Sequence, residues 1–210
     1  MIKHYKYPRT YHLPWSPNLQ NDDRLHPNIN IFENREVIVT SKMDGENTNM
    51  YCDRIHARSL DSGYHISREW IKNLHGQIKH EIPNNMRICG ENLFAKHSIY
   101  YTNLDTYFMV FSIWEDDYCL SWDDTIEYCN LFKLKTVSVL YRGIWDENLI
   151  KSLVVENEEE GYVVRIADGF VHDFDKRFFS LVAKYVRKNH IQTEQNWMYQ
   201  PMIKNQLKHI

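Results

Sequence analysis

Long apolar runs are absent from this 210-residue chain. None approaches the roughly 18 residues that a membrane-spanning helix needs, and residues 1–15 lack the apolar stretch of a secretory signal. The four cysteines, Cys52, Cys89, Cys119 and Cys129, lack the spacing of a zinc site, so we expect free thiols in a reducing cytoplasm. The chain has no GxGxxG and no Walker loop, and the standard nucleotide-binding folds are therefore not indicated.

A strong charge of one sign is also lacking, because the formal net charge is −3. A global basic field therefore does not indicate nucleic-acid binding. The charge is uneven, however: residues 1–21 hold three basic residues and no acid, and residues 184–210 hold five basic residues against Glu194. We expect both ends to contact phosphates; the alternative is that short basic ends are merely solvated.

The sequence does contain a series of short apolar segments, which favour an α+β fold with mainly antiparallel sheets flanked by helices. Strands are expected at 36–41, 48–52, 87–94, 107–114, 161–166 and 178–186. Helices are expected at 67–80, from 121 onward, at 146–154 and around 194–207. Residues 8–30 contain four prolines among polar residues, which predicts a segment that wraps a surface without regular structure.

Local signals accompany these elements. The Asp44-Gly45 pair predicts a tight turn that returns the chain from the first strand to the second, as in a hairpin. Ser67 and Ser121 are candidate N-caps of the first two helices, and Asp124 follows Ser121 at the spacing of a capping pair.

Lys42 stands at the end of the first strand, directly before the Asp44-Gly45 turn. A solvated lysine has a pKa of about 10.4 and is a poor nucleophile at neutral pH. Burial and a neighbouring cation would lower that pKa and free the lone pair, which makes Lys42 a candidate covalent nucleophile. K-x-D-G is a short pattern, however, and on its own it fits an ordinary surface turn.

Three further charged residues lie within or beside apolar strands: Glu91, Glu160 and Lys184. A charge in a buried run is unfavourable unless it is paired, metal-bound or functional. Two carboxylates with bound water suit a hard divalent cation such as Mg²⁺, and the cation and Lys184 together could neutralise a phosphate as charge develops on it. A buried Glu91–Lys184 ion pair with a purely structural role is the alternative.

The ordered segments KMDG, GEN, YFMVFSIW, EGYVVR and AKYVR resemble the motifs of the covalent nucleotidyltransferases, which include DNA ligases, RNA ligases and mRNA-capping guanylyltransferases. Further segments, such as YPRTYHLPWSPN, HARSLDS and CLSWDDT, are similar to the RNA ligase branch with T4 RNA ligase 2-like and Deinococcus-type enzymes. The resemblance implies a nucleotidyltransferase domain, the ATP-grasp-like adenylation domain of ligases. It also implies an ATP-dependent RNA ligase that joins 3′-hydroxyl and 5′-phosphate ends of RNA, for example in RNA repair.

By this resemblance, Lys42 takes up AMP from ATP, and the AMP passes to the 5′-phosphate of an RNA strand before the ends are joined. Lys184 would bind the α-phosphate, and Glu160 the hydration shell of Mg²⁺ or Mn²⁺. Glu91 would be a second metal residue, acting through water. Arg165, at the end of the Glu160 strand, is a further candidate.

The resemblance also implies an ATP-binding set. Glu91 would hold the ribose hydroxyls, Phe111 would stack on the adenine, and Arg58 would contact the ribose or the phosphates. Asn47 would help to bind ATP or to sense the 5′-phosphate, and Ser41 belongs to the same set beside the nucleophile. Core packing is the alternative role for Phe111, because other apolar residues share its strand.

Two features depart from the family pattern. The second lysine of the last motif is replaced by Val186, which puts phosphate contact at that position in doubt, although Arg187 or Lys188 could substitute. The segments before Lys42 and after Arg187 are short for the oligonucleotide-binding barrel of many relatives. We therefore expect residues 1–210 to form a single adenylyltransferase domain that grips RNA through its own basic ends or through a separate RNA-binding or end-healing protein.

Two other functions stay open. A GTP-using capping-type transferase would share the lysine chemistry, and a ligase-like module that binds RNA or nucleotide without catalysis would share the fold. Preference for RNA over DNA follows from the resemblance alone, and a nicked duplex or single strands are both possible substrates.

Overall fold

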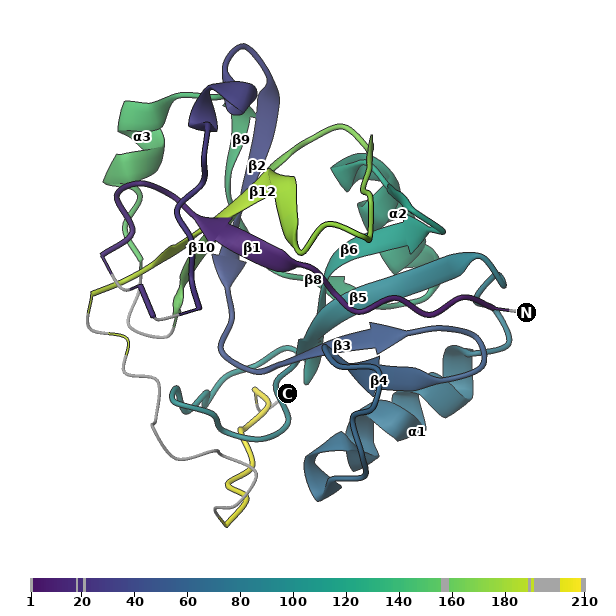
Figure 1. The fold of residues 1–210 in the computed structure, drawn as a ribbon. Helices are drawn as coiled ribbons and strands as arrows, with labels where there is room; N and C mark the ends of the chain where they lie inside the picture. Colours follow the sequence, from purple (N-terminus) through teal and green to yellow (C-terminus); the bar gives the residue numbers. More distant parts are fainter. Residues whose placement is uncertain are drawn as a thin grey trace.

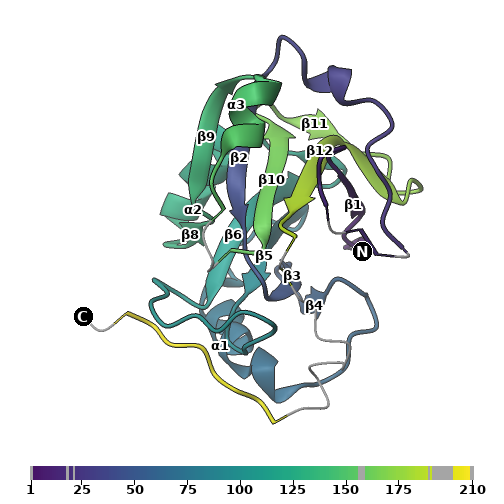
Figure 2. The ribbon, with the colours of Figure 1, turned by 90° about the vertical axis from the view of Figure 1, so that its left-hand side faces the viewer.

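The computed structural model of the chain describes residues 2–17, 19–20, 22–155, 159–188, 190 and 201–208. Within these residues the strands form two sheets. The first sheet has the order β1 (Arg9–His12), β12 (Phe178–Val186), β10 (Gly161–Ile166), β2 (Glu36–Lys42) and β9 (Val139–Ile144). Figure 2 shows these strands side by side, with β3, β4 and α1 below them.

The second sheet contains the remaining strands of the described part of the chain. Its order is β11 (Phe170–Val171), β7 (Tyr118–Cys119), β6 (Phe108–Glu115), β5 (Met86–Asn92), β3 (Glu46–Met50) and β4 (Ile55–Ala57), and β8 (Lys135–Thr136) pairs with β6. The β1–β12 and β6–β8 pairs are parallel and the other pairs between named strands are antiparallel. The expected α+β fold with mainly antiparallel sheets is therefore confirmed.

The described part of the chain has three α-helices, which lie against these sheets (Figure 1): α1 (Glu69–Ile78), α2 (Trp122–Leu131) and α3 (Glu147–Ser152). Apolar residues of α1 and α2 pack in one cluster with β5 and β6 of the second sheet, whereas Ile150 of α3 joins the cluster of the first sheet. Ser121 caps α2 as expected, because its side chain accepts a hydrogen bond from the amide of Asp124. None of the described helices combines the length and the apolar character needed to cross a membrane.

A shared apolar core joins the two sheets. Val39 and Phe179 of the first sheet pack in one buried cluster with Cys89 and Trp114 of the second. Full burial of a large apolar side chain stabilises a fold by about 1.5–3 kcal/mol, so this cluster fixes how the two sheets meet. The functional residues lie where the sheets meet.

Three expectations for local structure are wrong. Asp44-Gly45 does not close a hairpin, because β2 and β3 belong to different sheets and the turn carries the chain from one to the other. Ser67 does not cap α1: it lies in a 3₁₀ turn, Ile66–Arg68, that precedes the helix. Part of the proline-rich segment 8–30 is regular, since Arg9–His12 forms β1 beside β12.

The described end of the chain, residues 201–208, is extended and not helical. It forms isolated bridges with Ala95 and Leu104, and the rest of the helix expected around 194–207 lies outside the described residues. Lys208 pairs with Asp105, and the ammonium of Lys204 lies 5.2 Å from the centre of the Phe94 ring. Contact of this end with phosphates therefore stays a prediction, and both lysines already have partners within the chain.

Candidate active site

A pocket of about 260 Å³ opens where the two sheets meet. Lys42 lines this pocket, and so do all the residues expected to bind the nucleotide: Ser41, Asn47, Arg58, Glu91, Phe111 and Lys184. They come from both sheets and from the segment after β4. The fold thus brings together residues that the sequence keeps up to 143 positions apart (Ser41 and Lys184).

Lys42 and Glu160 meet because β2 and β10 are neighbouring antiparallel strands. Gly161 is the register partner of Lys42, and the amide of Glu160 donates to the carbonyl of Lys42 at 3.0 Å. The ammonium of Lys42 donates to the carboxylate of Glu160, whose side chain is only 6% exposed. A Cβ at Gly161 would lie 1.9 Å from the carbonyl oxygen of Tyr185, so only glycine permits this close approach of β10 and β12.

The Glu160 carboxylate sets the protonation of Lys42. Burial acts to lower the pKa of Lys42, but the charges of Glu160 and Glu91 outweigh it and leave this pKa above its usual value of 10.5. The lowered pKa expected from sequence is therefore wrong for this state, because the partner is an anion and not a cation. Lys42 rests as an ammonium ion, and attack on a phosphate requires that it lose a proton.

Hydrogen bonds fix the turn after Lys42. Asp44 Oδ2 accepts from the amides of Ser98 and Ile99, both at 2.7 Å, and the Asp44 amide donates to the Tyr101 hydroxyl at 2.8 Å. The Gly45 amide donates to Glu91 at 3.2 Å. This network holds the buried Asp44 carboxylate beside Lys42.

Glu91 lies on β5 and also lines the pocket. Burial raises the pKa of Glu91 to about 8, and the carboxylates of Glu160 and Asp44 add to that rise while Lys42 opposes it. Three acidic side chains thus surround one lysine. This crowding of carboxyl groups fits a bound cation, which would favour their ionised forms.

Lys184 extends from β12, two strands away from β2 in the same sheet. Its Nζ lies 3.1 Å from Asp23 Oδ1, and the other Asp23 oxygen lies 3.1 Å from His12 Nε2. The partner of Lys184 is therefore Asp23, and the expected structural alternative, a Glu91–Lys184 pair, is wrong. Burial and the charge of Lys42 lower the pKa of Lys184.

Phe111 and Arg58 also line the pocket. Phe111 is half-buried on β6, and its ring centre lies 5.4 Å from that of Tyr7 in an edge-on arrangement. Arg58 Nε donates to the Tyr7 carbonyl at 3.3 Å. Burial lowers the pKa of Arg58, and the charge of Arg9 adds to this effect. An aromatic ring with cations nearby suits a base and its phosphates.

The remaining expected residues have partners within the protein. Ser41 donates to Glu159, and Asn47 Oδ1 accepts from Asn49 at 3.0 Å. Arg165 lines the pocket, but its Nη2 donates to the Leu120 carbonyl at 2.6 Å, which gives it a structural role. Substitution of the missing lysine by Arg187 or Lys188 stays a prediction.

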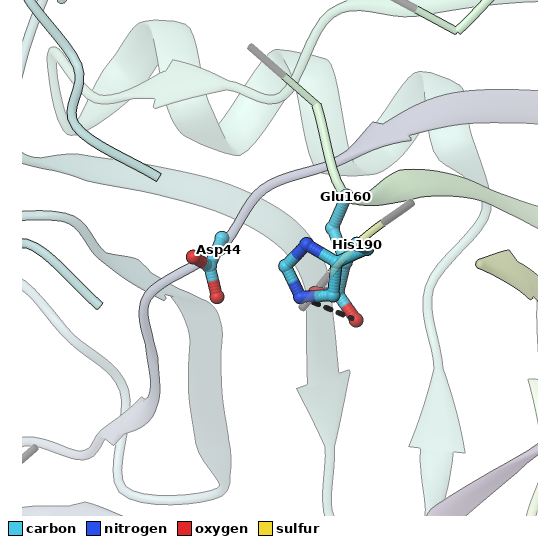
Figure 3. A group of neighbouring side chains, drawn as sticks. All are labelled: Asp44, Glu160 and His190. Carbon is cyan, nitrogen blue, oxygen red and sulfur yellow. Dashed lines mark ion pairs between the residues drawn. The ribbon is translucent and has the colours of Figure 1, made fainter. Parts of the chain in front are cut away.

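Sequence reasoning missed Asp23, His190 and the cation-binding potential of Asp44. Asp44, Glu160 and His190 are buried, and one potential ligand atom of each lies within 4.8 Å of the others. Figure 3 shows their side chains converging from separate segments. Oxygen and nitrogen atoms at this spacing fit a divalent cation. Glu91 was expected in this role; it lies outside this group of described residues, and its metal contact stays a prediction.

A family model and several solved structures match this chain. The family model described as RNA ligase matches residues 35–186, a range that contains Lys42, Glu91, Glu160 and Lys184. No curated protein matches the chain by sequence.

Three solved structures are similar to this fold. They are a Naegleria gruberi RNA ligase with PPi (TM-score 0.53, 18% identity, 89% of this chain and 60% of that chain), an archaeal ATP-dependent RNA ligase (0.57, 17%, 86% and 48%), and an Aquifex aeolicus protein described as a candidate ATP-dependent DNA ligase (0.53, 18%, 86% and 49%). At these identities the likeness shows a shared fold. The chain spans between 48% and 60% of the length of these proteins.

Proposed function

The chain belongs to the RNA ligase family, and we propose that it joins 3′-hydroxyl and 5′-phosphate ends of RNA in an ATP-dependent reaction. The observation that carries this proposal is the pairing of Lys42 with Glu160 at the edge of a pocket that also contains Lys184 and Phe111. Nucleotide transfer to a lysine needs a buried lysine and a carboxylate that can accept its proton. It also needs a second cation for the phosphate and an aromatic side chain against the base.

In the first step, the neutral amine of Lys42 attacks the α-phosphorus of ATP. A P–N bond forms, the bond from the α-phosphorus to the bridging oxygen breaks, and pyrophosphate leaves. The proton of Lys42 is lost toward Glu160 or solvent, and Lys184 exchanges its contact with Asp23 for the α-phosphate. A divalent cation, when bound, supplies positive charge that stabilises the transferring phosphate, and the Asp44–Glu160–His190 group would hold it.

The second and third steps use the same residues. An oxygen of the RNA 5′-phosphate attacks the lysine-bound AMP, the P–N bond breaks, and Lys42 recovers a proton. The 3′-hydroxyl of the other strand then attacks the 5′-phosphate, and AMP leaves as the phosphodiester forms. Throughout, Lys184 and Arg58 offset phosphate charge and Phe111 holds the base.

The wider setting is part of the proposal. We place the protein in the cytoplasm because Cys52, Cys89, Cys119 and Cys129 are all free thiols. Residues 1–210 would act as a single adenylyltransferase domain. RNA would be held by the basic segments at residues 1–21 and 184–210, or with help from a separate RNA-binding or end-healing protein.

A sealing assay tests this function. The protein, ATP and Mg²⁺ or Mn²⁺ are incubated with end-labelled strands that differ in two ways: RNA or DNA on each side of the junction, and a nicked duplex or free single strands. Joining of RNA, with ATP preferred over GTP, is the expected result. Three outcomes would overturn the proposal. Sealing of DNA alone would select a DNA ligase, and preference for GTP would select a capping-type transferase. RNA binding without any nucleotide transfer would select a binding module.

A further inference from the structure

His190 lies beside the carboxylates of Asp44 and Glu160 (Figure 3). Its Nε2 is 3.9 Å from Glu160 Oε1, and the potential ligand atoms of Asp44, Glu160 and His190 all lie within 4.8 Å of one another. Metal–ligand bonds of about 2.1–2.4 Å place two ligands on opposite sides of an ion about 4–5 Å apart. One cation can therefore contact all three side chains after small movements.

We propose that His190 is a direct nitrogen ligand of the divalent cation at this site and that it shifts the cation preference from Mg²⁺ toward Mn²⁺. The inference rests on the proposed function, in which the pocket takes ATP together with a divalent cation. Mg²⁺ favours oxygen ligands and keeps much of its water, whereas imidazole suits transition-metal ions. A site of two carboxylates and one imidazole thus offers both the oxygen ligands that Mg²⁺ favours and a nitrogen ligand that suits Mn²⁺.

The backbone fixes His190 relative to Glu160. The amide of His190 donates to the Arg187 carbonyl at 3.2 Å, and the Arg187 amide donates to the Glu160 carbonyl at 3.1 Å. Arg187 Nε also donates to the Glu159 carbonyl at 2.8 Å. The imidazole is therefore held near the Glu160 carboxylate by a short chain of hydrogen bonds, which limits its freedom before any cation binds.

Asp44 is oriented in a similar way. Two amides, those of Ser98 and Ile99, donate to its Oδ2, which leaves Oδ1 available for a cation. Outer hydrogen bonds of this kind orient metal ligands and tune their affinity.

Binding of Mn²⁺ alone tests the assignment, with no ATP or RNA present. Electron paramagnetic resonance of free Mn²⁺ gives its dissociation constant, competition gives the Mg²⁺ constant, and electron spin echo modulation detects a ¹⁴N nucleus bound to the ion. The protein should show histidine ¹⁴N modulation. Selective ¹⁵N-histidine labelling should change the modulation, a readout that needs no variant.

His190→Gln keeps a polar side chain of similar reach but removes the imidazole. It should lose the nitrogen modulation and weaken Mn²⁺ binding by at least about tenfold, with a smaller effect on Mg²⁺. His80→Gln, at a histidine after α1 and away from the pocket, is the matched control and should behave as the unsubstituted protein. Bound Mn²⁺ without nitrogen modulation, or unchanged Mn²⁺ and Mg²⁺ constants in His190→Gln, would overturn the inference. Because neither readout uses ligation, failure here is distinct from failure of the proposed function.

Discussion

Asp23 Oδ1 lies 3.1 Å from Lys184 Nζ, so a carboxylate from the N-terminal segment pairs with the lysine assigned to the α-phosphate. The same carboxylate contacts the buried His12. A phosphate that enters the pocket must compete with Asp23 for Lys184. We therefore expect the N-terminal segment to affect the affinity of the pocket for anions.

Asp23→Asn should tighten ATP binding, because it removes a negative charge from the phosphate site. One unit charge about 4 Å away is worth about 1 kcal/mol in water, which corresponds to roughly a fivefold lower Kd. Calorimetry in a Lys42→Ala background measures binding without reaction. Asp123→Asn, at an ion-paired aspartate of α2 away from the pocket, should leave the Kd unchanged. Equal or weaker ATP binding by Asp23→Asn would contradict the competition.

Phe111 has two possible roles, and one substitution separates them. Phe111→Leu keeps an apolar side chain but removes the ring, so it should weaken AMP binding by about 1–3 kcal/mol, roughly 5- to 150-fold. Phe111→Tyr should retain binding. Phe132→Leu, at a buried ring of another cluster, is the control for loss of stability alone. A lower Tm with unchanged AMP affinity in Phe111→Leu would assign Phe111 to the core.

Glu91 makes stability depend on pH. Burial raises its pKa from 4.5 to about 8, so the folded protein holds a proton that the unfolded chain loses between these values. The contribution of a group with a raised pKa is complete below about pH 4.5 and is lost as pH rises through about 8.

Glu91→Gln should therefore flatten the Tm profile between pH 4.5 and 8 and raise Tm at pH 8. Each 1 kcal/mol gained would raise Tm by about 2–4 °C in a domain of this size. Thermal denaturation across this range measures both effects. Glu127→Gln, at a glutamate of α2 away from the pocket, should follow the unsubstituted profile. Parallel profiles for Glu91→Gln and the unsubstituted protein would show that Glu91 is ionised throughout.

Asn205 links the end of the chain to the turn after Lys42. Its buried side chain donates to the Leu93 carbonyl at 2.8 Å and accepts from the Tyr101 amide at 3.0 Å. The Tyr101 hydroxyl in turn accepts from the amide of Asp44. Asn205, in the described end of the chain, therefore supports the turn after Lys42 through one intervening residue, Tyr101.

Asn205→Ala should lower the free energy of unfolding by about 1–3 kcal/mol, because the Tyr101 amide loses its acceptor. Adenylylation should slow with little change in the KM for ATP, since the turn and not the pocket is disturbed. Single-turnover formation of labelled protein measures this rate. Lys208→Ala, which removes a half-exposed ion pair with Asp105, should change neither quantity by more than about 1 kcal/mol. Equal rates for the two variants would confine Asn205 to stability.

Local patterns were sufficient to predict the central strands. The apolar runs that become β10 and β12 are bounded by polar or turn residues, and both strands begin and end as expected, at Gly161–Ile166 and Phe178–Val186. Glu91, Glu160 and Lys184 stood out because a charge within or beside an apolar run needs a partner or a role, and Lys42 stood out because it directly precedes the Asp44-Gly45 turn. Each of these signals is contained in a single short segment of the sequence.

Contacts between segments that are far apart in the sequence could not be predicted from local patterns. Asp44-Gly45 has the composition of a hairpin turn, but its strands enter different sheets because β2 pairs with β10 and β9 and β3 pairs with β5 and β4. Asp23 comes from an irregular segment and meets Lys184 only after folding. The same holds for His190, which no spacing in the sequence connects with Asp44.

Covalent labelling tests the central claim most directly. Incubation with α-³²P-labelled ATP and Mg²⁺ or Mn²⁺ should label the protein with AMP, and peptide mapping should place the label on Lys42. Lys42→Ala and Lys42→Arg should both lose the label while retaining the fold by circular dichroism. A label that persists in Lys42→Ala, or that maps to another residue, would contradict the assignment of Lys42 as the nucleophile.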